Sequence, residues 1–381
     1  MPDTPHITLE LIGGSEDGVR YESPIACGYY WQADYDPRQR HASCQITPAL
    51  AASAKPRLEL RIAPHDLVTS RSMSSPARTT DFLSVENSQH LDELFREAVS
   101  AIDAGDIAAL EQFLVAHPNL VHERLESPGS WLRDQVGGAL DTFFKRPCLL
   151  WFVAEDPIRN GKLPSNIATV AQSIIRAAQR EAVTNLQKQL DYALKLVAWS
   201  TIAPKCGVQI NLIDTLVDAG ANPHGNPDNA LVNGNFAAAE RLVERGATLT
   251  LATALCLGRW DEAAQLAPAA TDRQKRFALV LAALNGQADA MRRMIALDVD
   301  VNAPSEDLHS HGTPLHHAVC SGSLDAVRAL VEAGADLNAK DTAWHGTPLG
   351  WAEHCAGDAA TNERGKMLRE IAAYLSALKT P

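Results

Sequence analysis

The chain lacks the features that mark membrane, secreted and nucleic-acid-binding proteins. None of its apolar runs approaches the roughly 20 residues that a membrane-spanning helix needs, so no membrane partner is expected. The first residues, Met1 to His6, contain no basic segment followed by an apolar core, so no signal peptide is expected either. A net charge of −12 disfavours nucleic acid and anionic membranes as partners, because both attract a basic surface.

Paired cysteines are also missing. The seven cysteines are scattered without short spacings, which is typical of free thiols in a reducing compartment, so a cytoplasmic location is expected. Histidine and cysteine do gather near the C-terminus, at His309, His311, His316, His317, Cys320, His345, His354 and Cys355. No pair of them has the usual zinc spacing, so no metal and no cofactor is expected, and a metal- or redox-sensing array is kept as an alternative.

Signals for helix boundaries, by contrast, are concentrated in residues 312–341. Thr313 can accept a hydrogen bond from an unpaired N–H at a helix start, and Pro314 suits the first helical position, where no N–H is needed. Apolar residues follow on one helical face: Leu315, Ala318 and Val319. Gly322 lies where this helix must end and the chain must turn, so the pattern predicts one short helix.

A second helix follows the same turn. Ser323 can cap its start, and Gly334 can end it. Its predicted buried stripe has helical spacing and consists of Leu324, Val327, Leu330 and Val331. Residues 336–339 then lead into an exposed hairpin, so all local signals agree on a helix–turn–helix–hairpin unit.

The stretch 312–341 resembles an ankyrin repeat nearly position for position, including the Thr-Pro-Leu-His opening. Because such a repeat cannot bury its apolar face alone, its neighbours are expected to be repeats as well. The resemblance also implies a structural role for His316, the histidine of this opening, which is expected to form hydrogen bonds inside the repeat and steady the turn.

Further units can be aligned on both sides of this stretch. The next opening, at 346–349, begins 34 residues after Gly312, and its second helix is expected at about 364–378. The residues of that helix expected to face inward are Met367, Leu368, Ile371, Tyr374 and Leu375. Earlier units are matched at 94–125, 147–182, 191–222, 229–249, 252–268 and 277–303. The resemblance therefore implies an all-α ankyrin-repeat solenoid of about eight helix pairs over residues 91–381.

The N-terminal ninety residues have a different composition. Residues 1–65 are predicted to be a small β-rich or partly disordered segment, because Ile7, Leu9 and Leu11 alternate with polar residues. The aromatic cluster at 29–35 is expected to form the core of a small sheet. Seven of the twelve residues from 69 to 80 are Ser or Thr, so residues 66–90 are predicted to be a linker.

By resemblance, the predicted function is a protein-interaction scaffold. Ankyrin arrays bind partners on their concave side, through hairpin tips and the exposed ends of first helices. In this sequence those places correspond to Asp307, Leu308, His309, Ser321, Thr342, Trp344, His345 and His354, with Glu306, Cys320, Ala343 and Cys355 beside them. Trp344 is the strongest candidate because tryptophan is enriched among interface hot spots, and packing on the neighbouring hairpin is an equal alternative for it.

Catalysis is not expected. The sequence contains no nucleophile elbow, no phosphate-binding glycine loop and no metalloprotease helix. An alternative function is an enzyme or effector whose activity lies in residues 1–90 and is targeted by the repeats. Such an activity would need convergent polar groups around His6, Tyr21, Asp34 or His41, and the sequence displays no motif of that kind there.

Overall fold

The chain divides into two compact units, Met1–Ala77 and Arg78–Pro381. The computed structural model describes residues 29–36, 41–48, 79–358 and 363–379. Each unit is described by itself below.

The described part of the first unit is one β-hairpin. Strand β1 (Tyr29–Asp36) pairs antiparallel with β2 (His41–Pro48), so that Tyr29 lies opposite Pro48 and Asp36 opposite His41. β1 contains the aromatic cluster predicted to belong to a sheet. The strand predicted around Ile7 to Leu11 lies outside the described residues.

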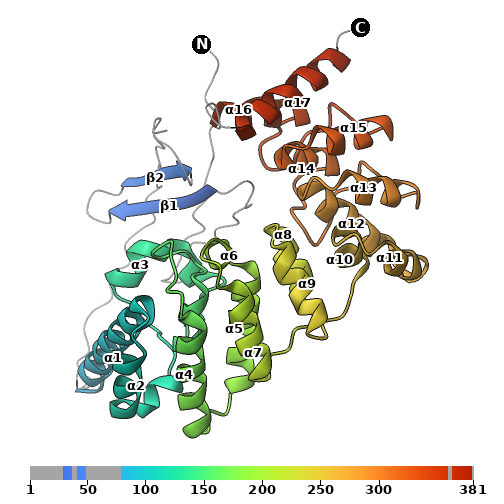
Figure 1. The fold of residues 1–381 in the computed structure, drawn as a ribbon. Helices are drawn as coiled ribbons and strands as arrows, with labels where there is room; N and C mark the ends of the chain where they lie inside the picture. Colours follow the sequence, from blue (N-terminus) through green and yellow to red (C-terminus); the bar gives the residue numbers. More distant parts are fainter. Residues whose placement is uncertain (1–28, 37–40, 49–78, 359–362, 380–381) are drawn as a thin grey trace. The chain divides into compact units, whose positions relative to one another are not determined.

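The described part of the second unit is helical (Figure 1). Its α-helices are α1 (Thr79–Ala104), α2 (Ile107–Ala116), α3 (Ser130–Val136), α4 (Ile167–Arg180), α5 (Leu186–Trp199), α6 (Ile202–Lys205), α7 (Gln209–Asp218), α8 (Asn226–Val232), α9 (Phe236–Glu244), α10 (Leu251–Cys256), α11 (Trp260–Leu266), α12 (Asp272–Leu284), α13 (Ala288–Ile295), α14 (Pro314–Ser321), α15 (Leu324–Glu332), α16 (Pro348–Asp358) and α17 (Glu363–Lys379). Short 3₁₀ helices are η1 (Pro118–Val121), η2 (Gly137–Asp141), η3 (Leu149–Ala154) and η4 (Ala267–Ala269). No helix in the described ranges is long and apolar enough to cross a membrane.

These helices form pairs that pack into two rows. Eight pairs occur in the described residues: α1–α2, η3–α4, α5–α7, α8–α9, α10–α11, α12–α13, α14–α15 and α16–α17. The first members contact one another in the order α1, η3, α5, α8, α10, α12, α14, α16. The second members do so from α2 through α4 and α7 to α9, and again from α13 through α15 to α17. The predicted all-α repeat architecture is therefore confirmed.

The boundaries of α14 and α15 are set by the residues that the sequence indicated. At the start of α14, the N–H and the hydroxyl of Thr313 lie 3.2 and 2.8 Å from Nδ1 of His316. The helix ends at Gly322, whose φ of 78° is a left-handed conformation that glycine adopts without strain. Ser323 then caps α15 by accepting the N–H of Ala326 at 3.3 Å.

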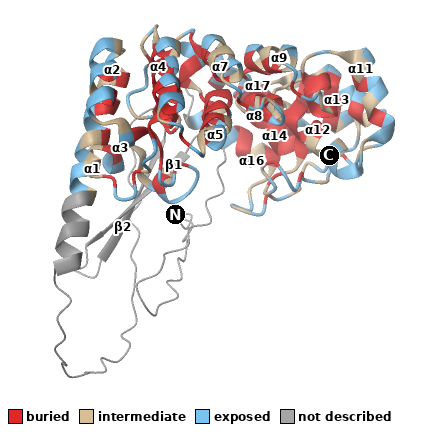
Figure 2. Cartoon of the chain, turned by 90° about the horizontal axis from the view of Figure 1, so that it is seen from below, coloured by how far each residue is buried: buried red, intermediate tan, exposed pale blue. Residues whose placement is uncertain are grey.

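Burial differs between the two rows of helices (Figure 2). Every residue of α10 is buried, and α14 is buried from Pro314 to Cys320. In α11 only Ala263 is buried, because the outer side of a second helix faces solvent. The apolar core thus lies around the first helices, where each fully buried Leu or Val contributes roughly 1.5–3 kcal/mol relative to exposure.

The last helix corrects one predicted stripe. Leu368, Ile371 and Leu375 of α17 are buried as expected, but Met367 is 50% exposed. Met367 lies one residue, or about 100° of helix, before Leu368, and α17 has no further helix in the described residues to cover that side. Tyr374 is half-buried, and the guanidinium of Arg328 lies over its ring, 5.5 Å from the centroid.

The first helix corrects part of the predicted linker. α1 begins at Thr79, so residues 79–90 are helical although 66–90 was predicted as a linker. The Ser and Thr content suggested a linker, but no proline or glycine lies between Pro76 and Gly105 to interrupt a helix. The remainder of the predicted linker lies outside the described residues.

The unit matched at 147–182 also departs from the standard repeat. Its first helix is the 3₁₀ helix η3, and an insertion loop at 155–166 separates η3 from α4. Inside this loop, Oε1 of Glu155 accepts the N–H of Arg159 and of Gly161, each at 2.8 Å. The Arg159 guanidinium in turn donates to Asp103 of α1 at 2.8 and 3.0 Å, so ion pairs and hydrogen bonds fix the insertion loop to the stack.

Candidate functional site

Asp341 is a buried carboxylate that organises the loop between α15 and α16. It is 1% exposed, and its Oδ1 accepts the N–H of Ala343 and of Trp344 at 2.9 and 2.6 Å. Its Oδ2 accepts the N–H of Gly346 at 2.7 Å and the indole N–H of Trp351 at 2.9 Å. Burial raises the pKa of Asp341, but these hydrogen bonds outweigh burial and hold the pKa below its ordinary value. A charged carboxylate therefore fixes the loop at neutral pH.

Gly346 closes this loop and links it to the preceding repeat. A Cβ at Gly346 would lie 2.9 Å from both Oδ2 of Asp341 and Cδ1 of Trp351, so no side chain fits there. The Gly346 carbonyl lies 3.1 Å from Nε2 of His316. Because a carbonyl only accepts, Nε2 carries the proton and donates it. His316 thus joins α14 to the next repeat, which confirms its expected structural role.

Three further histidines lie together, and one of them, His317, belongs to α14. The ring centroids of His309, His311 and His317 are 5.7 to 6.0 Å apart. His317 is buried, with Nε2 3.2 Å from the His309 carbonyl oxygen, and burial together with the neighbouring histidines lowers its pKa to about 3. Burial also lowers the pKa of His311. His311 and His317 are therefore neutral at physiological pH.

The described histidines and cysteines form neither a metal-binding group nor a disulfide. Among the described residues, no three His, Cys, Asp or Glu side chains are arranged to hold a metal ion. The described cysteines form no disulfide, and burial raises the pKa of Cys148 and of Cys256 to about 12. Both are therefore protonated and unreactive near neutral pH.

Trp344 packs on neighbouring aromatic rings and is 44% exposed. Its ring centroid is 5.3 Å from that of His311 and 5.8 Å from that of Trp351, both in edge-to-face arrangements. Trp351 is itself 8% exposed and stacks on His311 at 5.7 Å. Part of the Trp344 indole therefore packs on its neighbours, while the rest faces solvent on a loop that Asp341 holds in place.

Some of the other residues predicted to contact a partner are exposed, as predicted for hairpin tips and helix ends. Thr342, His345 and His354 are exposed. Asp307 is also exposed, but its Oδ2 accepts a hydrogen bond from Nε of Arg273 at 2.7 Å. We call the exposed part of the loop, Thr342, Trp344 and His345, the Trp344 surface.

Several predicted contact residues are instead used inside the protein. Leu308 is 7% exposed and Cys320 6%, so the prediction that Leu308 lies at an exposed hairpin tip is wrong. Leu308 is turned inward because the loop before α14 folds back on that helix, where His317 lies against the His309 carbonyl. The hydroxyl of Ser321 donates to the Ala318 carbonyl at 2.7 Å. His309 and Cys355 are half-buried.

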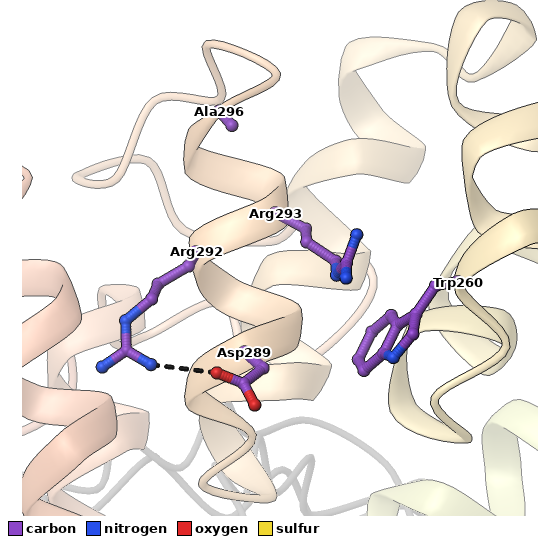
Figure 3. A pocket seen from close by; sticks show the side chains of 5 residues that line it. All are labelled: Trp260, Asp289, Arg292, Arg293 and Ala296. Carbon is purple, nitrogen blue, oxygen red and sulfur yellow. Dashed lines mark hydrogen bonds and ion pairs between the residues drawn. The ribbon is translucent and has the colours of Figure 1, made fainter.

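A second candidate lies on the outer row of helices, where Trp260, Asp289, Arg292, Arg293 and Ala296 line a shallow depression of about 330 Å³ (Figure 3). Arg293 reaches from α13 toward α11, and its guanidinium lies 4.3 Å from the centroid of the Trp260 ring. Arg292 extends from the other side of α13 and donates to Asp289 at 3.0 Å. We call this depression the α11–α13 groove.

The residues that build both candidates were not predicted from the sequence. Asp341 and Trp351 were not selected, although an aspartate five residues before Gly346 was visible in the sequence. Trp260 was visible as an unusually large residue at the first position of a second helix, where α9 begins with Phe236 and α15 with Leu324. No sequence signal indicated that Arg293 meets Trp260.

A family model matches part of the repeat region. Residues 230–341 match a family model described as ankyrin repeats, three copies, and the predicted resemblance is confirmed for this part of the chain. The solved structure of the human ASB11 ankyrin repeat domain is similar to this chain at 17% identity, over 54% of this chain and 96% of that one, with a TM-score of 0.27. Ankyrin repeats are generally protein–protein interaction modules.

Proposed function

We propose that the protein is a non-enzymatic interaction scaffold in the cytoplasm and that a partner protein contacts the Trp344 surface on the concave side of the repeats. The observation that carries this proposal is the combination of exposure and rigidity at Trp344. The indole is 44% exposed, yet its backbone N–H is bound by a buried carboxylate and its ring contacts His311 and Trp351. A pre-ordered exposed tryptophan loses little conformational entropy when a partner covers it.

Neighbouring residues support the same surface. Thr342 and His345 are exposed on the same loop, and His354 is exposed on the adjoining first helix α16. They supply hydrogen-bonding groups around an aromatic centre, which is the usual composition of a hot spot with a polar rim. The raised pKa values of Cys148 and Cys256 favour binding over thiol-based sensing at those two positions.

The experiment is affinity capture of the tagged full chain at native expression level, with chemical crosslinking and mass spectrometry to locate the contact. Trp344→Ala and His345→Ala are expected to lose the partner. Phe143→Ala is the matched control, because Phe143 is an aromatic residue of similar exposure, 40% against 44%, in a different loop. Retention of every captured partner by Trp344→Ala, with crosslinks elsewhere, would refute this surface.

A further inference from the structure

Successive second helices carry different residues at one equivalent position. Asp214 of α7, Arg241 of α9, Gln265 of α11 and Arg293 of α13 each lie seven residues after the turn glycine that precedes their helix. At the α7–α9 junction, Arg241 donates to both carboxylate oxygens of Asp214, from Nε at 2.8 Å and from Nη2 at 3.0 Å. The guanidinium of one helix therefore meets the carboxylate of the helix before it.

At the α11–α13 junction an arginine occupies the equivalent position, but the preceding helix supplies no carboxylate. Arg293 takes the place of Arg241, but the residue equivalent to Asp214 is Gln265, which is exposed and neutral. α11 makes its close contacts with α10 and η4, whereas α7 packs directly on α9. Within the part of the chain that the structure describes, Arg293 has its ring contact with Trp260 and no ion pair.

We infer that the α11–α13 groove is a second protein-binding site, which takes an acidic segment of a partner by placing one Asp or Glu carboxylate on Arg293. Arg293 is exposed and its guanidinium lies over the Trp260 ring, so its paired N–H donors can reach a carboxylate of a partner. The bidentate contact between Arg241 and Asp214 is the internal precedent for this geometry.

The chemistry of the groove also indicates what should flank the carboxylate. Trp260 is half-buried and Ala296 is exposed, so apolar surface borders the guanidinium. Arg292 is already paired with Asp289, which leaves Arg293 as the unneutralised charge of the groove. The expected segment therefore carries Asp or Glu next to an apolar side chain that covers Trp260. This site is separate from the Trp344 surface.

The test is selection of short random peptides displayed on phage by the immobilised full chain, with parallel selection on Arg293→Gln. Peptides recovered on the wild type and lost on Arg293→Gln are expected to contain Asp or Glu. In fluorescence polarisation, replacing that residue with Gln or Asn should weaken binding roughly tenfold, as for loss of a charge-assisted hydrogen bond. Arg293→Lys should bind more weakly than wild type, because a lysine cannot form the bidentate contact.

Arg328→Gln is the matched control, since Arg328 also lies over an aromatic ring, that of Tyr374, but is 3.7 Å from the carboxylate of Asp325. This variant should recover the same peptides as the wild type. The inference is overturned if no peptide is recovered, if wild type and Arg293→Gln recover the same peptides, or if the lost peptides lack a carboxylate. Tighter binding of a phosphoserine peptide than of its Glu counterpart would also overturn it, in favour of a phosphate ligand.

Discussion

Two loops in different repeats are each built around a buried carboxylate. The hydrogen-bond and ion-pair partners of the two carboxylates differ. Asp341, before α16, accepts hydrogen bonds from three backbone N–H groups and one indole, all of them neutral donors. Glu155, in the insertion loop, also accepts backbone N–H groups, but its Oε2 lies 3.0 Å from Nη2 of Arg159. The Arg159 side chain is 2% exposed and also pairs with Asp103.

The comparison shows two ways to build a rigid loop on a repeat. The Asp341 carboxylate is held by neutral donors and therefore depends on the loop backbone. It needs the fixed spacing to Gly346, where a Cβ would not fit. A carboxylate paired with a buried arginine depends on that one side chain, because removing it leaves an unpaired buried charge. Each loop also exposes one large apolar residue, Trp344 at 44% and Ile158 at 38%. The rings of His311 and Trp351 contact the Trp344 indole in edge-to-face arrangements.

The largest expected effect breaks the ion-paired loop. Arg159→Met should lower the free energy of unfolding by about 3–5 kcal/mol, because Glu155 and Asp103 lose their buried partner. Urea denaturation of the full chain measures it. Adding Glu155→Gln should recover part of the loss, since it removes the orphaned charge. A loss in Arg159→Met below about 1 kcal/mol, typical of an exposed pair, would contradict the buried-pair interpretation.

The next effect breaks the loop that is held by neutral donors. Asp341→Ala should cost about 2–4 kcal/mol, because it leaves buried N–H groups without acceptors. Urea denaturation gives the cost, and tryptophan fluorescence reports on Trp344 and Trp351. Asp336→Ala is the control, because Asp336 is exposed and accepts one local N–H, from Asn338 at 2.8 Å. Equal stability losses in the two variants would show that Asp341 does not organise the loop.

The two loops also show how far the sequence could predict this protein. Thr313, Gly322 and Ser323 act over a few residues, so helix boundaries in 312–341 followed from local signals. The pairing of Arg159 with Asp103 joins residues 56 positions apart, and no local pattern indicates it. Leu308 was misplaced for a related reason, since its burial depends on how a loop folds back on α14.

The candidate sites were predicted less completely than the fold. Exposure of Trp344 followed from its position in a hairpin, whereas its support by Asp341 and Trp351 required the packed structure. The α11–α13 groove arises from the short α11 and from the pairing of Trp260 with Arg293, residues of different repeats. Contacts between irregular repeats are not encoded in the repeat motif, so the motif could not reveal the groove.

A loss of stability at acidic pH, of intermediate size, is expected from a histidine near the Asp341 loop. His317 has a pKa of about 3 in the folded protein against an ordinary 6.5, because burial disfavours the charged ring. The unfolded chain therefore binds a proton that the folded protein does not, and stability falls as the pH drops from 6.5 toward 3. The slope is about 1.4 kcal/mol per pH unit, so the loss between neutral pH and pH of about 5 is about 2 kcal/mol.

The measurement compares urea denaturation of wild type and His317→Gln across this pH range. Glutamine does not titrate and can still donate to the His309 carbonyl. Other groups change stability with pH in the opposite direction. Asp156 is one of them, because burial raises its pKa to about 7. These groups are common to both proteins, so their effects cancel in the difference. Parallel pH profiles for the two proteins would rule out the depressed pKa of His317.

The smallest expected effect on stability concerns the residue proposed to matter most for binding. Trp344→Ala should change the free energy of unfolding by less than about 1.5 kcal/mol, because the indole is 44% exposed and Trp351 beneath it stays packed on His311 and His316. Ile158→Ala, at 38% exposure in the ion-paired loop, should cost about as little. The two variants should separate in partner affinity, where a hot-spot tryptophan costs about 2 kcal/mol or more, roughly thirtyfold. Calorimetry with the captured partner measures this difference, and equal affinities of both variants would mean that rigid support beneath an exposed side chain does not select the binding surface.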